Sequence, residues 1–189
     1  ILAAVRYQRK KLPGDPANLA SPYDKSTEVG GHSVYKQTAL VHSDDGGRTW
    51  SRPRLVTGWL QQTACLVRLS DGTLLLPFGH KDQGFGQRFL MSFDQGVSWT
   101  RTVFELGRGG LYASSVVLPD ATLLTVHDNR KGKGGRGFRV LRWKPPSRQT
   151  ASAAGFFKPR PVETSGSTQT AARSAGKNRS HDGVWKPVS

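Results

Sequence analysis

The chain has 189 residues and a formal net charge of +15, because 28 Lys and Arg outnumber 13 Asp and Glu. A chain of this length is typical of one domain, or of one domain with a tail. Its single cysteine, Cys65, excludes an internal disulfide framework, and the sequence contains no transmembrane or signal-peptide run.

The predicted elements are strands, because apolar and β-branched runs are bounded by turn residues and no segment has helical periodicity. In chain order we expect strands at 1–7, 35–42, 54–57, 64–69, 74–78, 88–92, 102–105, 115–118, 122–127 and 137–143. A long loop, 8–33, separates the first two strands, whereas the corresponding later connection, about 79–87, is short. The long loop is either an insertion on a binding face or a tolerated surface excursion.

Two copies of the pattern S-x-D-x-G-x-[TS]-W lie 49 residues apart. The matching residues are Ser43, Asp45, Gly47, Thr49 and Trp50 in the first copy and Ser92, Asp94, Gly96, Ser98 and Trp99 in the second. A second pattern, at 69–75 and 118–124, repeats with the same offset. Two motifs that share one offset indicate a repeat protein, such as a propeller or a solenoid.

The chemistry of each copy predicts a hairpin loop rather than a catalytic centre. The Asp can accept hydrogen bonds from backbone N–H groups, and the Gly supplies a conformation that other residues avoid. The Trp then buries a large ring with its N–H near a polar partner. We therefore expect Asp45 and Asp94 to brace turns.

The two copies resemble the Asp boxes of sialidases and related BNR-repeat proteins, which form six-bladed β-propellers. Residues 63–77 resemble an inner strand, a turn and a second strand of that family, and residues 114–120 resemble the start of another blade. The resemblance covers about residues 1–144. It implies an all-β fold, a partial six-bladed propeller with about three four-stranded antiparallel blades.

The remaining blades would lie outside this chain, which we expect to be a truncated form of a longer secreted or periplasmic protein. The alternative is a complete small β protein. If the 49-residue offset continued, a third Asp box would begin near Leu141, but the sequence there lacks the pattern. This is typical of the last blade of a propeller, or of a further blade whose sequence has been replaced. In residues 145–189, 26 of 45 residues are Ser, Thr, Ala, Gly or Pro, and this composition predicts a disordered basic tail.

The densest basic stretch, 130–139, has no acidic residue. Such a stretch is either a solvated hairpin loop or a surface for anions. Because no nucleic-acid-binding motif accompanies it, we favour the loop and expect neither a nucleic-acid nor a membrane partner. Near the mouth of a propeller, a positive field would also help to capture an acidic substrate.

The resemblance implies an exo-α-sialidase type of hydrolase, which removes terminal acidic sugars from glycoconjugates. Such enzymes use a Tyr nucleophile with a Glu partner, an Asp acid/base and arginines that grip the carboxylate. Residues 2–9 resemble the strand that bears one of these arginines, so Arg6 or Arg9 would bind substrate. Asp15, or more remotely Asp24, would be the acid.

Other positions depart from the family pattern. Tyr112 and His127 stand where a Glu and a second arginine would be expected, and they are the remaining catalytic candidates. By the repeat, Gln62 and His80 face the same channel as further substrate-binding residues. The histidines lack the spacing of metal ligands, so no metal and no cofactor are expected. The alternative function is a non-catalytic carbohydrate-binding or interaction module.

Overall fold

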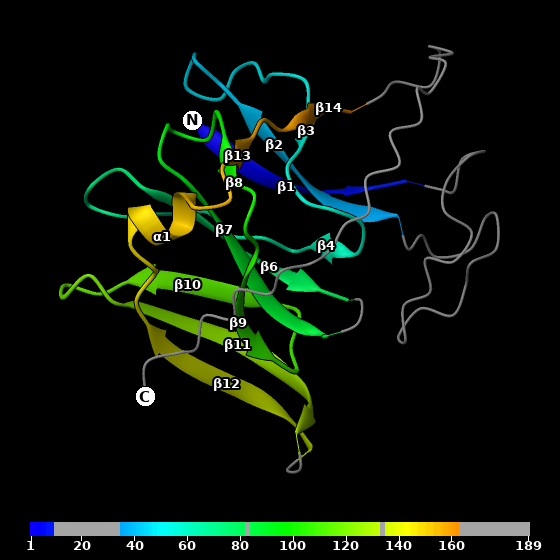
Figure 1. Ribbon diagram of the computed structural model, residues 1–189. Helices are drawn as coiled ribbons and strands as arrows, with labels where there is room; N and C mark the ends of the chain where they lie inside the picture. The colour runs from blue at the N-terminus through cyan, green and yellow to red at the C-terminus, as the bar shows by residue number, and fades with distance from the viewer. Residues whose placement is uncertain (10–34, 82–83, 133–134, 163–189) are drawn as a thin grey trace.

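In the computed structural model, residues 1–9, 35–81, 84–132 and 135–162 are described here (Figure 1). The strands are β1 (Leu2–Gln8), β2 (Lys36–His42), β3 (Arg54–Leu55), β4 (Gln61–Gln62), β5 (Val67–Arg68), β6 (Leu74–His80), β7 (Gly86–Ser92), β8 (Trp99–Thr100), β9 (Phe104–Arg108), β10 (Ala113–Val117), β11 (Leu123–Gly132), β12 (Gly135–Trp143), β13 (Phe156–Phe157) and β14 (Arg160–Pro161). One short helix, α1 (Arg148–Ser152), follows β12.

The strands form three consecutive antiparallel units. In the first unit β1 pairs with β2 and β2 with β3; in the second, β4 and β5 pair with β6, β6 with β7 and β7 with β9. The third unit is the separate sheet β10–β11–β12, which lies below the others in Figure 1. The fold is therefore all-β with several antiparallel sheets, and no sheet closes on itself within the described residues.

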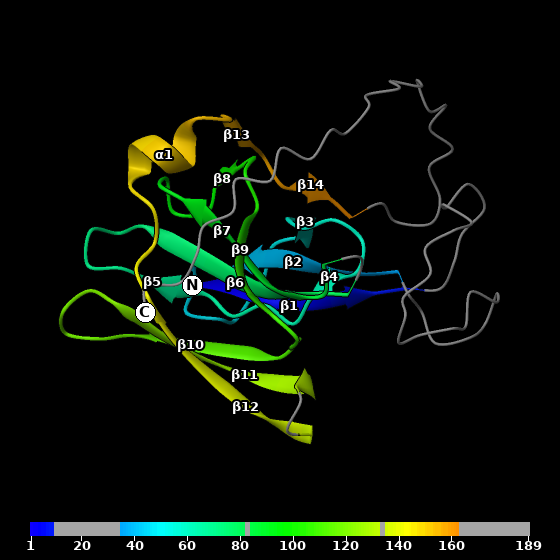
Figure 2. The ribbon, with the colours of Figure 1, turned by 60° about the horizontal axis from the view of Figure 1, so that its bottom comes forward.

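The first two units meet in one nine-stranded sheet. Their link is a parallel contact between β2 and β4, in which Gln37 is the partner of Gln61. Figure 2 shows the third sheet continuing beyond β6, on the side away from β2. The units thus follow one another in chain order, with the second unit between the other two.

Both faces of the second unit are buried, because each one packs on a neighbouring unit. On β6, Leu76 and Phe78 pack with Leu40 of β2, whereas Leu75 packs with Leu123 and Trp143 of the third unit. This alternation follows the two-residue period of a strand. It explains why β6 is a nearly continuous apolar run instead of an apolar and polar alternation.

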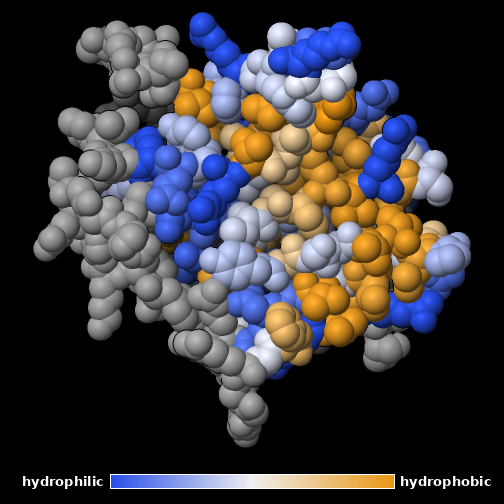
Figure 3. Space-filling view, turned by 180° about the vertical axis from the view of Figure 1, so that it is seen from behind, coloured by the Kyte–Doolittle hydropathy of each residue, from blue (hydrophilic) through white to orange (hydrophobic). Residues whose placement is uncertain are grey.

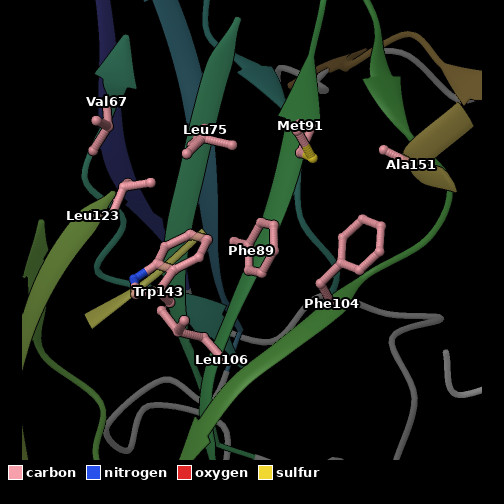
Figure 4. Packing of buried hydrophobic residues seen from close by; sticks show 9 residues of the cluster. All are labelled: Val67, Leu75, Phe89, Met91, Phe104, Leu106, Leu123, Trp143 and Ala151. Carbon is pink, nitrogen blue, oxygen red and sulfur yellow. The ribbon is translucent and has the colours of Figure 1, made fainter. Parts of the chain in front are cut away.

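The core between the second and third units is rich in aromatic side chains (Figure 4). The Phe89 ring stacks on Phe104 with ring centroids 5.0 Å apart and lies 4.8 Å from Trp143. The Trp143 indole is fully buried, and its Nε1–H donates to the Thr125 hydroxyl at 2.8 Å. Trp143 therefore joins its unit to the second one by apolar packing and satisfies its polar group within its own sheet.

The prediction of disorder for 145–189 is wrong for residues 145–162. Helix α1 begins after Ser147, whose hydroxyl accepts from the Thr150 N–H at 3.2 Å, and its Ala151 is buried in the core of the second and third units. β13 then pairs with β8, and β14 pairs with β3. The segment is ordered because its few apolar groups pack in the core and its backbone pairs with strands of two units. Composition alone cannot predict such contacts.

Residues 163–189, the loop residues 10–34 and the pairs 82–83 and 133–134 lie outside the described part of the chain. None of the helices described is long and apolar enough to cross a membrane.

Phe156 and Phe157, which the sequence suggests are isolated, form β13. Phe156 makes an edge-to-face contact with Phe93 at a centroid distance of 6.0 Å.

Candidate functional site

The strand directions separate two ends of the molecule. β2 and β7 run into the two Asp-box loops, which lie at one end, called here the Asp-box end. The opposite end, called the polar end, contains the last residues of β1 and β6 and the first residues of β2, β4 and β10. The polar end also contains the stretch of β11 that pairs with the start of β10.

At the Asp-box end, the first loop is held by the Asp45 carboxylate. It accepts from the Arg48 and Thr49 N–H groups at 3.0 and 2.9 Å, and from the Thr49 hydroxyl at 2.6 Å. The Ser43 hydroxyl donates to Asp45 and accepts from the Gly47 N–H, both at 2.8 Å. Gly47 has φ of 95°, a region that favours glycine.

The second loop repeats the same network. Asp94 accepts from the Ser98 N–H at 2.8 Å and from the Ser98 hydroxyl at 2.6 Å. The Ser92 hydroxyl donates to Asp94 and accepts from the Gly96 N–H, both at 2.9 Å. In both copies the carboxylate is fully engaged by its own loop, so it is a structural brace rather than a group open to substrate.

These hydrogen bonds stabilise the charged form of both carboxyl groups. The bonds from the Thr49 hydroxyl and N–H, together with Ser43, hold the pKa of Asp45 well below its usual value. Burial raises the pKa of Asp94, but the bonds from Ser98 and Ser92 outweigh it, so this pKa is also lowered.

The two Asp-box tryptophans differ in burial. The indole N–H of each donates to the Gly carbonyl of its own loop, at 3.1 Å for Trp50 and 3.2 Å for Trp99. Trp99 is fully buried between the first and second units, but Trp50 is 45% exposed, so the expected burial is wrong for Trp50. The reason is that Trp99 packs against the unit before its own, and no described unit precedes that of Trp50.

At the polar end, the first unit presents Arg9. Its guanidinium lies 4.9 Å from the Trp59 ring centroid and 5.2 Å from that of Tyr35. These distances are those of cation–π contacts. The backbone N–H of Arg9 donates to the Tyr35 carbonyl at 3.2 Å, which extends the pairing of β1 and β2. Arg6 is exposed on β1, where it is the register partner of Thr38.

The second unit contains His80, which is 8% exposed, beside the short strand β4. The Gln61 amide lies 3.4 Å from His80 Nδ1, and the backbone on either side of β4 has positive φ, at 62° for Leu60 and 58° for Thr63. Positive φ is rare for a β-branched residue such as Thr. The Thr63 conformation is held by its hydroxyl, which donates to the Leu111 carbonyl at 2.9 Å.

The third unit presents Tyr112, which is 47% exposed. The Asp128 carboxylate of β11 accepts from the Leu111 N–H at 2.6 Å and from the Tyr112 N–H at 2.8 Å. The loop before β10 is packed tightly, because a Cβ at Gly110 would lie 1.8 Å from the Asp128 carbonyl oxygen. Asp128 therefore fixes the backbone on which Tyr112 is carried.

Two of the predicted residues are interior groups. His127 is 1% exposed, its Nδ1 lies 2.8 Å from the Asp128 carbonyl oxygen, and its Nε2 has no hydrogen-bond partner among the described residues. Gln62 is also 1% exposed. Both face the junction of the second and third units. Gln62 pairs with Gly79, where a Cβ would collide with Leu111, and a Cβ on Gly107 of β9 would lie 3.6 Å from His127 Nε2. Their burial does not support direct contact with a substrate.

The predicted site residues that are described therefore share one end but not one cluster. Arg9 belongs to an aromatic group of the first unit, His80 to the β4 edge, and Tyr112 to the third unit. The two candidate acids, Asp15 and Asp24, lie outside the described residues.

Sequence reasoning missed Asp128 and Thr63. One feature of the sequence could have pointed to Asp128, because this residue directly follows His127 at the end of a predicted strand. No local feature could have pointed to Thr63, because its role depends on a carbonyl 48 residues away.

The polar end is strongly basic. Its described cationic residues include Arg6, Arg9, Lys36, Lys81, Arg88, Arg108 and Arg139. Glu105 and Asp128 are its described acidic residues; Glu105 pairs with Arg108 at 2.8 Å. Seen from behind, hydrophilic residues gather on the left, which is the polar end, while apolar residues cover the centre of the view (Figure 3). Over the described ranges, no group of three or more His, Cys, Asp or Glu residues could hold a metal ion.

Comparisons with known proteins agree with this architecture. A crystal structure of a protein of unknown function from Dyadobacter fermentans is similar, with a TM-score of 0.50 and 22% sequence identity. The match covers 67% of this chain and 34% of that one, so the chain spans about a third of its length. At this identity the likeness is one of fold alone. No curated protein matches the chain.

The family model of the BNR repeat-like domain matches residues 23–138. This range includes both Asp boxes and the turn that repeats with them. It leaves outside the first strand and the segment that forms α1, β13 and β14. Since the match covers more than half of the 189 residues, the chain belongs to the BNR repeat-like domain family of the sialidase superfamily.

Proposed function

We propose that this chain forms three consecutive blades of a β-propeller and that its polar end binds the acidic sugar of a glycoconjugate. The three antiparallel units, their order in the chain and the Asp boxes that follow β2 in the first unit and β7 in the second unit support the propeller. The remaining blades of the parent protein would lie outside this chain.

The observation that carries the binding function is the number of basic and hydrogen-bonding groups that three units place at the polar end. Arg9, His80 and Tyr112 come from three different units and lie at this end, away from both Asp boxes. The end contains more described cations than anions, and both anions there are engaged, Glu105 by Arg108 and Asp128 by backbone N–H groups. Among the described residues, an anionic ligand therefore meets donors and positive charge without a competing free carboxylate.

A direct binding measurement tests this function. We expect sialyllactose to bind the chain in isothermal titration calorimetry and lactose, which lacks the carboxylate, to bind at least about tenfold more weakly. Tyr112→Ala should weaken the binding of sialyllactose, and the matched control Phe138→Ala, an exposed aromatic on β12, should not change it. Equal affinity for lactose and sialyllactose would contradict the proposal.

Hydrolysis of the same sugar is the second candidate, favoured by the exposed Tyr112 hydroxyl on a backbone fixed by Asp128. A retaining mechanism needs a carboxylic acid near the leaving group, and this acid would have to come from the undescribed loop that holds Asp15. A fluorogenic sialoside measures turnover directly. Turnover that is abolished by Tyr112→Phe and by Asp15→Asn would establish hydrolysis, whereas binding without turnover would leave the chain a binding module.

A further inference from the structure

A pocket of about 160 Å³ lies on the first unit, beside the C-terminal segment. Its wall is formed chiefly by Tyr7, Arg9, Gln37, Leu55, Trp59 and Arg160. These residues come from β1 and the residue after it, β2, β3, the loop before β4, and β14. The volume is smaller than the roughly 300–1,000 Å³ of pockets for drug-sized ligands, so the pocket suits a ligand of a single ring.

This pocket is separate from the junction that contains Tyr112. On the first unit, Leu2, Ala4 and Leu40 pack against the second unit. Tyr7 and Gln37 have the opposite strand parity, so their side chains lie on the other face of β1 and β2. The pocket therefore lies on the face of β1 and β2 that is turned away from the second unit, whereas Tyr112 belongs to the third unit.

The pocket contains a buried acceptor. Gln37 is 1% exposed, and its Nε2 donates to the Thr57 carbonyl at 2.8 Å. Its Oε1 accepts no hydrogen bond from the described residues. Burying a polar atom without a partner is costly, so the amide oxygen favours a ligand that can donate an O–H or N–H to it.

The pocket is also cationic. Arg9 lies over the Trp59 ring, and Arg160 enters from β14, where it is the register partner of Leu55. No Asp or Glu is among the described residues that line it. Guanidinium groups bind carboxylates through paired hydrogen bonds, so two of them select an anion.

Aromatic rings are the third feature of the pocket, after the buried acceptor and the two arginines. Trp59 and Tyr7 both line the pocket, and aromatic faces pack well against flat apolar surfaces. A ligand that satisfies all three features has a carboxylate, a hydroxyl and a ring with an apolar face.

We propose that this pocket binds a small hydroxylated carboxylate, with an acidic monosaccharide as the class that fits best. Its carboxylate pairs with Arg9 and Arg160, one hydroxyl donates to Gln37 Oε1, and the ring lies against Trp59 or Tyr7. The site lies apart from Tyr112, around which the binding of glycoconjugates is proposed, although Arg9 is one of the basic groups invoked for both. It also assigns a role to the C-terminal segment, since Arg160 reaches the pocket only because β14 pairs with β3.

D-glucuronate is the test ligand, measured with the full chain by calorimetry and by the indole N–H signal of Trp59 in NMR, assigned with Trp59→Phe. We expect saturable binding, with D-glucose and acetate each at least about tenfold weaker, because glucose lacks the carboxylate and acetate lacks both the hydroxyl and the ring. Equal affinity for acetate and glucuronate would reduce the pocket to a charge site and overturn the proposal. Absence of binding by glucuronate would overturn it as well.

Two substitutions locate the site. Gln37→Leu removes the buried acceptor, and Arg160→Glu reverses one charge; each should weaken glucuronate binding at least about tenfold. Arg160 is exposed, so its variant keeps the test valid if Gln37→Leu fails to fold. Arg148→Ala is the matched control, because this arginine lies in the same segment but over Phe93, at 4.9 Å. Unchanged affinity in the Arg160 variant would refute the assignment.

One further variant separates this proposal from the proposed function. Tyr112→Ala should leave glucuronate binding unchanged while it weakens sialyllactose. If Arg160→Glu abolished the binding of sialyllactose and Tyr112→Ala did not weaken it, all acidic-sugar binding would belong to the pocket, and the proposed role of Tyr112 would be refuted. If Tyr112→Ala abolished the binding of glucuronate, the pocket would not be a separate site.

Discussion

In each Asp box the serine hydroxyl is shared between two partners. The Ser92 hydroxyl donates to Asp94 and accepts from the Gly96 N–H, and the Ser92 side chain is fully buried. Ser43 makes the same two bonds in the first loop and is 2% exposed. The serine, rather than the more exposed Asp, is thus the buried centre of each loop.

Ser92→Ala should lower the free energy of unfolding by about 1–3 kcal/mol, because it leaves the buried Gly96 N–H without an acceptor. Urea denaturation followed by tryptophan fluorescence measures the loss. Ser70→Ala, an exposed serine in the turn before β6, should change the stability by less than about 0.5 kcal/mol. A Ser92 variant as stable as this control would show that the loop is held by other contacts.

The two Asp-box carboxyl groups also predict a dependence of stability on pH. Their pKa values in the folded protein lie below the usual 3.8, so the unfolded chain binds protons more readily than the folded one. The resulting stabilisation is fully present above about pH 5 and is lost as the pH falls below 3.8 towards the lowered values.

Thermal unfolding measured from about pH 6 to pH 2.5 should therefore show a melting temperature that falls with acidification. In the double variant Asp45→Asn and Asp94→Asn the melting temperature should be lower at neutral pH and should depend less on pH. An unchanged pH dependence in the double variant would mean that other carboxyl groups cause it.

At the scale of elements, the C-terminal segment ties the units together. Its α1 places Ala151, which has no exposed surface, in the core of the second and third units. β13 and β14 then pair with strands of the second and first units. One segment of 18 residues, 145–162, thus touches all three units, although most of it is polar or small.

Ala151→Asp should destabilise the fold by about 2–4 kcal/mol, because it buries a carboxylate without a partner. Ala154→Asp, an exposed alanine three residues further on, is the matched control and should have little effect. Both variants can be compared by urea denaturation. Equal stability of the two would show that α1 does not pack on the core.

The elements that sequence reasoning placed correctly are longer strands, such as β6, which is an apolar run, and β12, in which apolar residues are interspersed with arginines. It missed β4, β8, β13 and β14, which are two residues long and owe their pairing to partners far away in the chain. It also missed α1, because five residues are too few to show helical periodicity, although Ser147 after two prolines is a usable N-cap signal.

At the scale of the whole molecule, the third unit leaves one face open. Val116, Val126, Val140 and Phe138 share a strand parity and are between 39% and 81% exposed. β12 also forms the edge of its sheet in the described structure. Exposed apolar faces and free edges favour association.

We therefore expect the chain to self-associate with rising concentration in sedimentation velocity experiments. The double variant Phe138→Ser and Val140→Lys should shift the distribution towards the monomer, since it places polar groups on the open face. Val97→Lys, an exposed valine in the second Asp box, is the control and should not shift it. Association that is unaffected by the double variant would point to another surface.

The sequence by itself determined the repeat, the all-β class and the hydrogen-bonding chemistry of the Asp boxes, because these depend on contacts within about eight residues. The tertiary structure alone decided which groups of the polar end are exposed. It buried His127 and Gln62 between two units, and it joined Arg160 to Arg9 and Gln37. Such relations depend on the packing of whole units, and a periodic pattern contains no information about which of its faces another unit will cover.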